Sequence, residues 1–278
     1  MLKINDLTFG YSRKALLFKS LDLTLEDGHI YGLLGKNGAG KSTLLKIMIG
    51  LAFPKKGSCL LNGINVSDRP VTILEDIFFI AEELFLPPLT PVEFAKNTSV
   101  FYPKFDMGNF YHNLKLLEVD QNEKMSTQSY GQQKKAMIAF GLATNTNLII
   151  MDEPTNGLDI PSKVQFRKLI AAVQTENRCI VISTHQVRDL ESLIDTMLVL
   201  HNGEIVVNSS IDHIGEKLCF GIYSNTAELS VLYQEENIRG KNVILPNSSK
   251  ELSKVDIELL FNGIISGNQS LLKILKAS

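Results

Sequence analysis

The chain has 278 residues, 44% of them hydrophobic, with a mean hydropathy of +0.06, a net charge of −2 and a pI near 6.2. These values indicate a globular protein of one or two domains and exclude a disordered chain. The near-neutral charge gives no electrostatic case for nucleic-acid binding, so we expect no nucleic-acid partner. No apolar run approaches the roughly 18–20 residues that span a bilayer. The charged start, Met1–Asp6, lacks a signal-peptide apolar region, which makes a cytoplasmic location the default expectation.

Residues 1 to about 34 have the pattern of strands around a turn at Glu26–Gly28. The last of these, Ile30–Leu34, is continuously apolar and predicts a buried strand, whereas Ser42–Met48 predicts a helix. Gly50 and Pro54 then end that helix. Cys59–Leu61 predicts a further strand before an Asn-Gly turn. The three cysteines are far apart and form no C-x-x-C pair, so we expect neither a disulfide nor a zinc site.

The loop between the buried strand and the helix carries the first chemical motif. Gly35–Ser42 fits the pattern G-x-x-x-x-G-K-[ST], which wraps nucleotide phosphates. Its glycines let backbone N–H groups turn inward, Lys41 can reach the β- and γ-phosphates, and Ser42 can ligate Mg²⁺. A glycine-rich turn with an incidental lysine is the alternative. The strand–loop–helix frame favours the phosphate loop.

The pattern changes from about residue 87 to residue 143, where apolar residues such as Phe110, Leu114 and Leu117 recur at helical spacing and predict a mostly helical insert. Continuous apolar runs then return, and each predicts a buried strand: Leu148–Met151, Cys179–Ile182 and Met197–Leu200. Predicted helices at Lys163–Gln174 and Val187–Leu193 separate them. Strands that alternate with helices in this way indicate a parallel sheet covered on both faces.

Two carboxylates, Asp152 and Glu153, follow the strand Leu148–Met151 directly. At the carboxyl end of a central parallel strand, such groups point into the ligand crevice. Asp152 is therefore a candidate to hold Mg²⁺, and Glu153 is placed to polarise an attacking water. Two solvated acids at a strand end are the alternative, which the following Pro154–Asp159 makes less favoured.

Taken together, these motifs resemble the ATP-binding subunit of ABC transporters over about residues 1–215. Gly35–Thr43 matches the family's Walker A motif, and Asp152 with Glu153 matches Walker B and the catalytic carboxylate. Gly157–Asp159 matches the D-loop, and Ser183–His185 matches the strand end that carries the switch histidine. Ser129–Gln133 lies where the family has its signature Leu-Ser-Gly-Gly-Gln, and Tyr11 lies at the site of the adenine-stacking aromatic.

The resemblance implies an α/β fold: a P-loop NTPase (RecA-like) core with a mainly parallel sheet, an antiparallel β subdomain, a helical insert at about 87–143 and a small C-terminal α/β extension at 216–278. It implies ATP and Mg²⁺ as cofactors. The residues to which it gives catalytic roles are Glu153, His185 and Lys41. Those to which it gives nucleotide contacts are Tyr11, Gly35, Asn37, Gly38, Ala39, Gly40, Lys41, Ser42, Thr43, Ser129, Gly131 and Asp159. Those to which it gives metal contacts are Ser42, Asp152 and Glu82.

Some of these assignments have a structural alternative. The alternative for Tyr11 is an ordinary half-buried aromatic side chain rather than a ring that stacks on adenine. The alternative for His185 is a histidine at a strand end whose ring hydrogen-bonds only within the protein. The chain departs from the family pattern at the signature, where Gln128 replaces Leu and Tyr130 replaces the first Gly. The Q-loop glutamine is replaced by Glu82 or, one residue along, by Glu83. Oxygen ligation of Mg²⁺ survives that change, but a negative charge is added.

The family's signature binds the γ-phosphate held by the opposite subunit, so the resemblance implies a head-to-tail homodimer or a paired ATPase subunit. It also implies an integral membrane permease as partner, docked near Leu84–Asn109, with the chain at the inner face of the cell membrane. The tail Val255–Asn262 is similar to tails of ATPases that serve ABC-2-type exporters, which favours export over import. The alternative from another class is a regulatory or assembly ATPase that uses ATP as a switch and takes no part in transport.

Overall fold

The structure is a computed structural model that describes residues 1–12, 15–238, 240–249 and 251–276. Its centre is a mainly parallel sheet with the strand order β10-β9-β3-β8-β7-β6. The strands are β3 (Ile30–Leu34), β6 (Ile77–Ile80), β7 (Leu148–Asp152), β8 (Cys179–Thr184), β9 (Thr196–His201) and β10 (Glu204–Ser210). All neighbours pair in parallel except β10, which returns antiparallel to β9.

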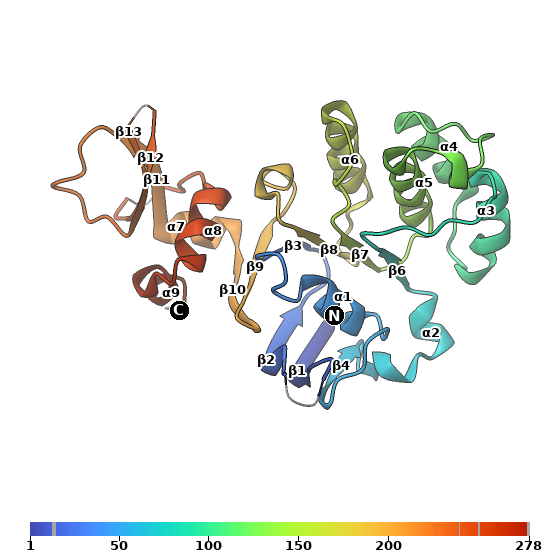
Figure 1. The fold of residues 1–278 in the computed structure, drawn as a ribbon, viewed down its shortest axis with the longest axis horizontal. Coiled ribbons are helices and arrows are strands. Elements are labelled where there is room, and N and C mark those ends of the chain that lie inside the picture. The colour runs from blue at the N-terminus through green and yellow to red at the C-terminus, as the bar shows by residue number, and fades with distance from the viewer. Residues whose placement is uncertain (13–14, 239, 250, 277–278) are drawn as a thin grey trace.

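The side chains of the central strands alternate between two hydrophobic cores. In β8, Ile180 and Ile182 belong to one core, and Cys179 and Val181 to the other. All four are buried, because both faces of a parallel sheet are covered. Helix α1 (Lys41–Met48) covers one face, and α5 (Tyr130–Ala143) and α6 (Ile160–Val173) lie over the other (Figure 1).

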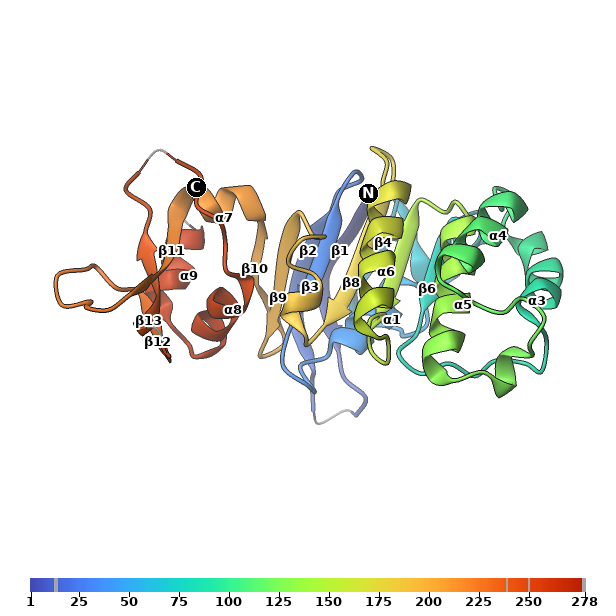
Figure 2. The ribbon, with the colours of Figure 1, turned by 90° about the horizontal axis from the view of Figure 1, so that it is seen from above.

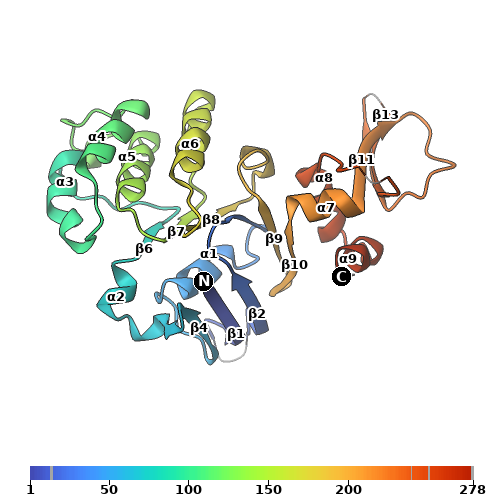
Figure 3. The ribbon, with the colours of Figure 1, turned by 180° about the vertical axis from the view of Figure 1, so that it is seen from behind.

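An antiparallel sheet with the order β2-β1-β4-β5 packs beyond α1 (Figures 1 and 3). Its strands are β1 (Leu2–Phe9), β2 (Phe18–Leu25), β4 (Lys56–Leu61) and β5 (Ile64–Asn65). The inward residues of β1 and β2 share a core with the apolar side of α1. The short elements η1 (Val66–Asp68) and α2 (Val71–Leu74) then lead to β6.

The helical insert lies at one end of the molecule (Figure 2). It holds α3 (Pro91–Thr98), η2 (Ser99–Phe101), α4 (Met107–Leu116), η3 (Met125–Thr127) and α5. A capping box of Thr90 and Glu93 starts α3, which satisfies orphan N–H groups at the helix end. Phe140 of α5 has the rings of Phe94 and Phe105 at 5.0 Å between centroids, so the insert has an aromatic centre.

The C-terminal part lies at the opposite end of the molecule, and its strands have the order β11-β13-β12 (Figure 2). Its elements are α7 (Ile211–Lys217), β11 (Leu218–Tyr223), β12 (Tyr233–Asn237), β13 (Gly240–Pro246), α8 (Ile257–Ile265) and α9 (Gln269–Lys276). Buried side chains of this part, such as Ile214 and Leu260, join the same core as α5 and α6. Helix α7 runs through residue 215, the expected end of the ATPase domain.

The predicted fold class is confirmed, with two differences in detail. The helix expected at Val187–Leu193 is only a 3-10 turn, η4 (Val187–Asp189), because the segment closes i→i+3 hydrogen bonds, from Leu190 to Val187 and from Leu193 to Leu190. Strands β6 and β10 of the central sheet were not predicted. Among the described residues, no helix is both long and apolar enough to cross a bilayer.

Candidate nucleotide-binding and hydrolysis site

The loop between β3 and α1 has the backbone shape that its glycines predict. Gly38 and Gly40 have φ angles of +79° and +105°, a region that residues with a side chain rarely adopt. Lys41, the first residue of α1, is 7% exposed and donates to the carbonyl of Gly35 at 2.9 Å. Its amine also lies 3.4 Å from the carbonyl of Lys36. The loop and the lysine therefore curl around one concave space at a helix N-terminus, which favours anions.

A cavity of about 650 Å³ opens at this loop. Predicted site residues that line it are Tyr11, Asn37, Gly38, Gly40, Lys41, Ser42, Thr43, Glu82, Glu153 and His185. Tyr11 is 76% exposed, and its hydroxyl lies 2.9 Å from that of Thr43. The contact fixes one end of the ring at the cavity. Of the two candidate Q-loop acids, Glu82 lines the cavity.

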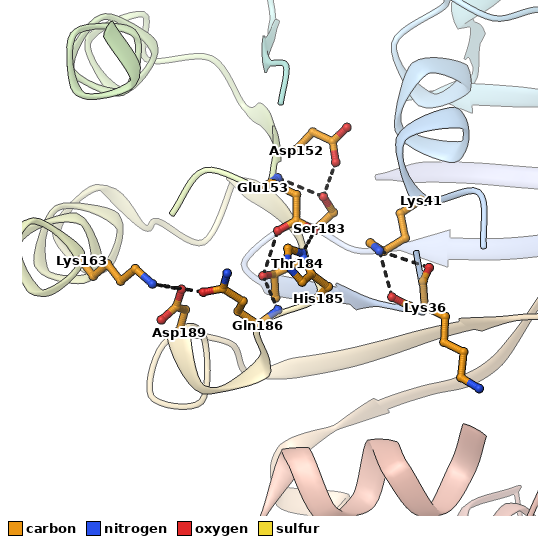
Figure 4. A network of polar contacts seen from close by, with 11 residues as sticks. Lys36, Lys41, Asp152, Glu153, Lys163, Ser183, Thr184, His185, Gln186 and Asp189 are labelled. Atoms are coloured by element: carbon orange, nitrogen blue, oxygen red, sulfur yellow. Dashed lines mark hydrogen bonds and ion pairs between the residues drawn. The ribbon is translucent and has the colours of Figure 1, made fainter. Parts of the chain in front are cut away.

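The carboxylates at the end of β7 are buried and held from the neighbouring strand (Figure 4). The hydroxyl of Ser183 donates to Asp152, its register partner across the parallel pair. Thr184 donates to Oε2 of Glu153 at 3.2 Å, and Nδ1 of His185 lies 2.8 Å from Oε1. Three successive residues thus hold the two acids. The structure brings Glu153 and His185, 32 residues apart, into direct contact.

Glu153 has a left-handed backbone, with φ of +48°. Its N–H lies 3.2 Å from both the hydroxyl and the carbonyl of Ser183, so β8 holds the turn that follows β7. A non-glycine residue in this region is uncommon and is kept only where the surroundings impose it. The turn aims the Glu153 side chain at the cavity rather than along the strand.

Sequence reasoning did not assign roles to Ser183 and Thr184. A signal was available, because two hydroxyl residues follow the apolar run of β8 at the same sheet edge as Asp152 and Glu153. Carboxyl ends of neighbouring parallel strands meet at one edge, so donors there face the acids. The register that pairs Ser183 with Asp152 comes only from the structure.

Lys41 is the buried cation of the cavity. Burial lowers the pKa of its amine, and attraction to Glu153, Asp152 and Glu82 opposes that shift. The ammonium group has lost much of its hydration, and no carboxylate of the described residues lies in salt-bridge contact with it. It therefore gains from an anionic ligand, such as a phosphate, more than a solvated lysine would.

The acids suit Mg²⁺ held together with phosphates. Within the described residues, no three His, Cys, Asp or Glu side chains cluster closely enough to hold a metal by themselves. Mg²⁺ prefers oxygen ligands and is usually bound through one or two carboxylates plus substrate phosphates. Of the three residues expected to bind the ion, Ser42 and Glu82 line the cavity at the phosphate loop, and Asp152 directly precedes Glu153, which also lines it.

Six of the predicted site residues lie outside the cavity lining in the described part of the chain: Gly35, Ala39, Asp152, Ser129, Gly131 and Asp159. Ser129 caps α5 by accepting from the N–H of Gln132 at 3.3 Å. Asp159 caps α6 by accepting from the N–H of Ser162 at 2.9 Å, and hydrogen bonds from Ser162 lower its pKa. A Cβ on Gly131 would lie 2.7 Å from the carbonyl oxygen of Gly157, so the signature and the D-loop touch within one chain.

A strand–phosphate loop–helix unit with two acids at the end of β7 defines the site of a P-loop nucleotide hydrolase. The family model described as "ABC transporter" matches residues 18–156. The chain is 32% identical to the ABC-type transporter ATP-binding protein EcsA of Bacillus subtilis, covering 84% of this chain and 96% of that protein. It is 31% identical to the lantibiotic transport ATP-binding protein SrtF of Streptococcus pyogenes, covering 76% and 92%.

The fold matches solved cassettes. An ATP-binding subunit of an ABC transporter superposes with a TM-score of 0.69 at 28% identity, covering 77% of this chain and 91% of that one. A dimeric post-hydrolysis cassette bound to ADP and Pi superposes with a TM-score of 0.67 at 25% identity, covering 76% and 98%. The chain belongs to the ABC transporter family of ATP-binding proteins. It is an ATP-hydrolysing subunit that uses ATP and Mg²⁺ to power transport, and such subunits pair as dimers with membrane permeases.

Proposed function

We propose that the cavity holds ATP with its phosphates on the loop after β3. The loop residues Gly35, Asn37, Gly38, Ala39, Gly40, Ser42 and Thr43 surround the phosphates, and Lys41 supplies the facing charge. The exposed ring of Tyr11 takes the adenine, because an aromatic face binds a base with little sequence demand. The support is the shared cavity, which both the tyrosine and the phosphate loop line.

Mg²⁺ would be held by Ser42, Asp152 and Glu82, with phosphate oxygens completing its shell. Bound there, the ion would neutralise charge on the β- and γ-phosphates. Asp152 has a fixed orientation because Ser183 donates to one of its oxygens, which leaves the other for the ion or its water. Glu82 is the least constrained of the three, since the contacts that hold it from described residues reach its main-chain carbonyl rather than its carboxylate.

Glu153 is the group we assign to the attacking water, and the hydrogen-bonded Glu153–His185 pair at the cavity wall carries this proposal. The carboxylate accepts a hydrogen bond from the water and orients it toward the γ-phosphorus. Because Nδ1 of His185 faces Glu153, its Nε2 is left to contact the γ-phosphate. The histidine thus connects the base to the group that is transferred.

Replacing Glu153 by Gln tests this assignment. The side chain keeps its size and one acceptor oxygen but loses its charge, so ATP binding should stay within about threefold of wild type while turnover falls by about 10²–10⁴-fold. Binding is measured by calorimetry and turnover by phosphate release. Turnover within about threefold of wild type would show that another group orients the water.

We further propose that two copies complete two sites, with Ser129, Gly131 and Asp159 of one copy facing the ATP of the other. All three positions lie at or beside the N-termini of α5 and α6 and outside the lining of the chain's own described cavity. A helix N-terminus favours phosphate oxygens. The likeness to a dimeric cassette supports the same arrangement.

We propose that the chain lies at the inner face of the cell membrane, with residues 1–215 as the ATPase domain, an insert at about 87–143 and an appendage at 216–278. A groove of about 520 Å³ lined by Leu51, Val71, Phe79, Val100 and Phe101 lies between the core and the insert. Three of these side chains, Val71, Val100 and Phe101, are more than two-thirds exposed. We propose that a permease segment docks there.

The likeness to a lantibiotic transport protein and the tail at Val255–Asn262 favour export.

A further inference from the structure

Tyr130, which replaces a glycine of the family's signature, folds back onto its own chain. Its hydroxyl donates to the main-chain carbonyl of Glu82. Its ring lies against Gly157, where an added Cβ would come within 2.8 Å of Cδ1 of the tyrosine. One side chain at the start of α5 therefore touches both the segment after β6 and the loop after β7.

Lys134 lies one turn further along α5 and completes the contact. It is fully buried, and its Nζ donates to the same carbonyl of Glu82 at 2.9 Å and to the hydroxyl of Tyr130 at 3.1 Å. Nζ also lies 5.2 Å from the centre of the Tyr130 ring. Two donors from one rigid helix thus converge on one oxygen. This oxygen belongs to a segment that has no helix or strand of its own.

The charges around Lys134 agree with this arrangement. A buried ammonium group is costly unless nearby acids compensate it. The acids that attract Lys134 are Glu82, Asp152 and Glu153, the same carboxylates that we place in the hydrolysis site. Burial lowers the pKa of the Lys134 amine, and attraction to these acids opposes that shift, so Lys134 offsets part of the negative charge that Glu82 adds where the family has glutamine.

We infer that Tyr130 and Lys134 are positioning residues, which hold the carbonyl of Glu82 and so set where its carboxylate lies at the Mg²⁺ edge of the cavity. The inference rests on the proposed role of Glu82 as a Mg²⁺ ligand. Fixing the main chain of residue 82 leaves only side-chain torsions to bring the carboxylate to the ion. We place the start of α5 against the partner's ATP. The contact with Glu82 therefore couples the position of this helix end to the Mg²⁺ edge of the cavity in its own chain.

The test uses the absence of tryptophan from the sequence. Phe85 is 92% exposed and three residues from Glu82, so Phe85→Trp places a single reporter on this segment. In that background, Tyr130→Phe removes only the hydroxyl. Tyr111→Phe is the matched control, since Tyr111 is equally exposed (41% against 40%) and its hydroxyl makes no hydrogen bond to a described residue.

The first readout is nanosecond depolarisation of the introduced tryptophan, which requires neither nucleotide nor turnover. The amplitude of the fast depolarisation phase should rise about twofold in Tyr130→Phe and in Lys134→Met, because a released loop segment moves on this timescale. In the Tyr111→Phe control it should stay unchanged. The second readout is the Mg²⁺ concentration at which half of the Mg²⁺-dependent increase in ATP affinity is reached. It should rise about three- to tenfold in Tyr130→Phe, the scale of one lost hydrogen bond, with ATP affinity in EDTA unchanged.

Unchanged depolarisation in Tyr130→Phe would overturn the inference. So would a lower unfolding temperature with an unchanged Mg²⁺ requirement, because that result describes a purely structural contact. Glu82→Ala separates the proposed ligand role from the positioning role. If Glu82→Ala leaves the Mg²⁺ requirement unchanged, Glu82 is not a ligand, and the depolarisation experiment still decides whether Tyr130 and Lys134 hold the segment.

Discussion

Removing the hydroxyl of Ser183 should weaken both the fold and the Mg²⁺ site. Ser183 is fully buried, and Asp152, which accepts from it, is 3% exposed. Ser183→Ala leaves that carboxylate oxygen without this donor, where water enters only with difficulty. A hydrogen bond to a buried charged group contributes about 1.5–3 kcal/mol. For a chain of this size, about 2 kcal/mol corresponds to a fall of roughly 4–8 °C in the unfolding temperature.

The assay is calorimetric unfolding without nucleotide, followed by titration of Mg²⁺ in ATP binding. Ser183→Ala should also raise the Mg²⁺ requirement about tenfold, because Asp152 is no longer oriented. Thr184→Val is the control, since its hydroxyl holds Glu153 rather than Asp152. It should lower stability comparably and leave the Mg²⁺ requirement unchanged. A Ser183→Ala protein that unfolds within about 1 °C of wild type with an unaltered Mg²⁺ requirement would refute this reasoning.

Two further predictions concern charge. Lys41→Ala should weaken ATP binding by about 10- to 100-fold, which is the scale of lost hydrogen bonds to a charged group. It should not lower the stability of the nucleotide-free protein, because burial of the amine is costly. An unchanged ATP dissociation constant would contradict the role of Lys41. Hydrogen bonds from Ser162 lower the pKa of Asp159 below 3.8, so its ionised form stabilises the fold above about pH 4, and this contribution is lost as the pH falls through the lowered pKa. Asp159→Asn should therefore reduce the loss of denaturant resistance between pH 6 and pH 3, and an identical acid profile would count against the cap.

The phosphate loop and the acids after β7 were predictable because their signals are local. Continuous apolar runs predicted β3, β7 and β8, and the chemical residues follow these strands directly along the chain. The covered parallel sheet followed from strands that alternate with helices, and the rest of the fold class followed from the resemblance to the ABC transporter family. For the same reason the helical insert could be predicted from the spacing of its apolar residues.

What the sequence did not show depends on pairing across the chain. Strand β10 is an antiparallel edge strand whose partner, β9, fixes its register, and its own residues end in the polar run Asn208–Ser210, which is untypical of a strand. The hydroxyls of Ser183 and Thr184 acquire meaning only when β8 lies beside β7. Tyr130 was visible only as a departure from the family pattern, because its contact with Glu82 spans 48 residues.

The central claim, that ATP is shared between two copies of the chain, is tested most directly by the mass of Glu153→Gln in solution. With MgATP, size-exclusion chromatography with light scattering should show one chain of 30.9 kDa becoming two, and MgADP should leave it single. Adding Ser129→Arg should abolish the dimer while each chain still binds ATP. A dimer that forms equally without nucleotide, or that persists with arginine at position 129, would contradict the shared site.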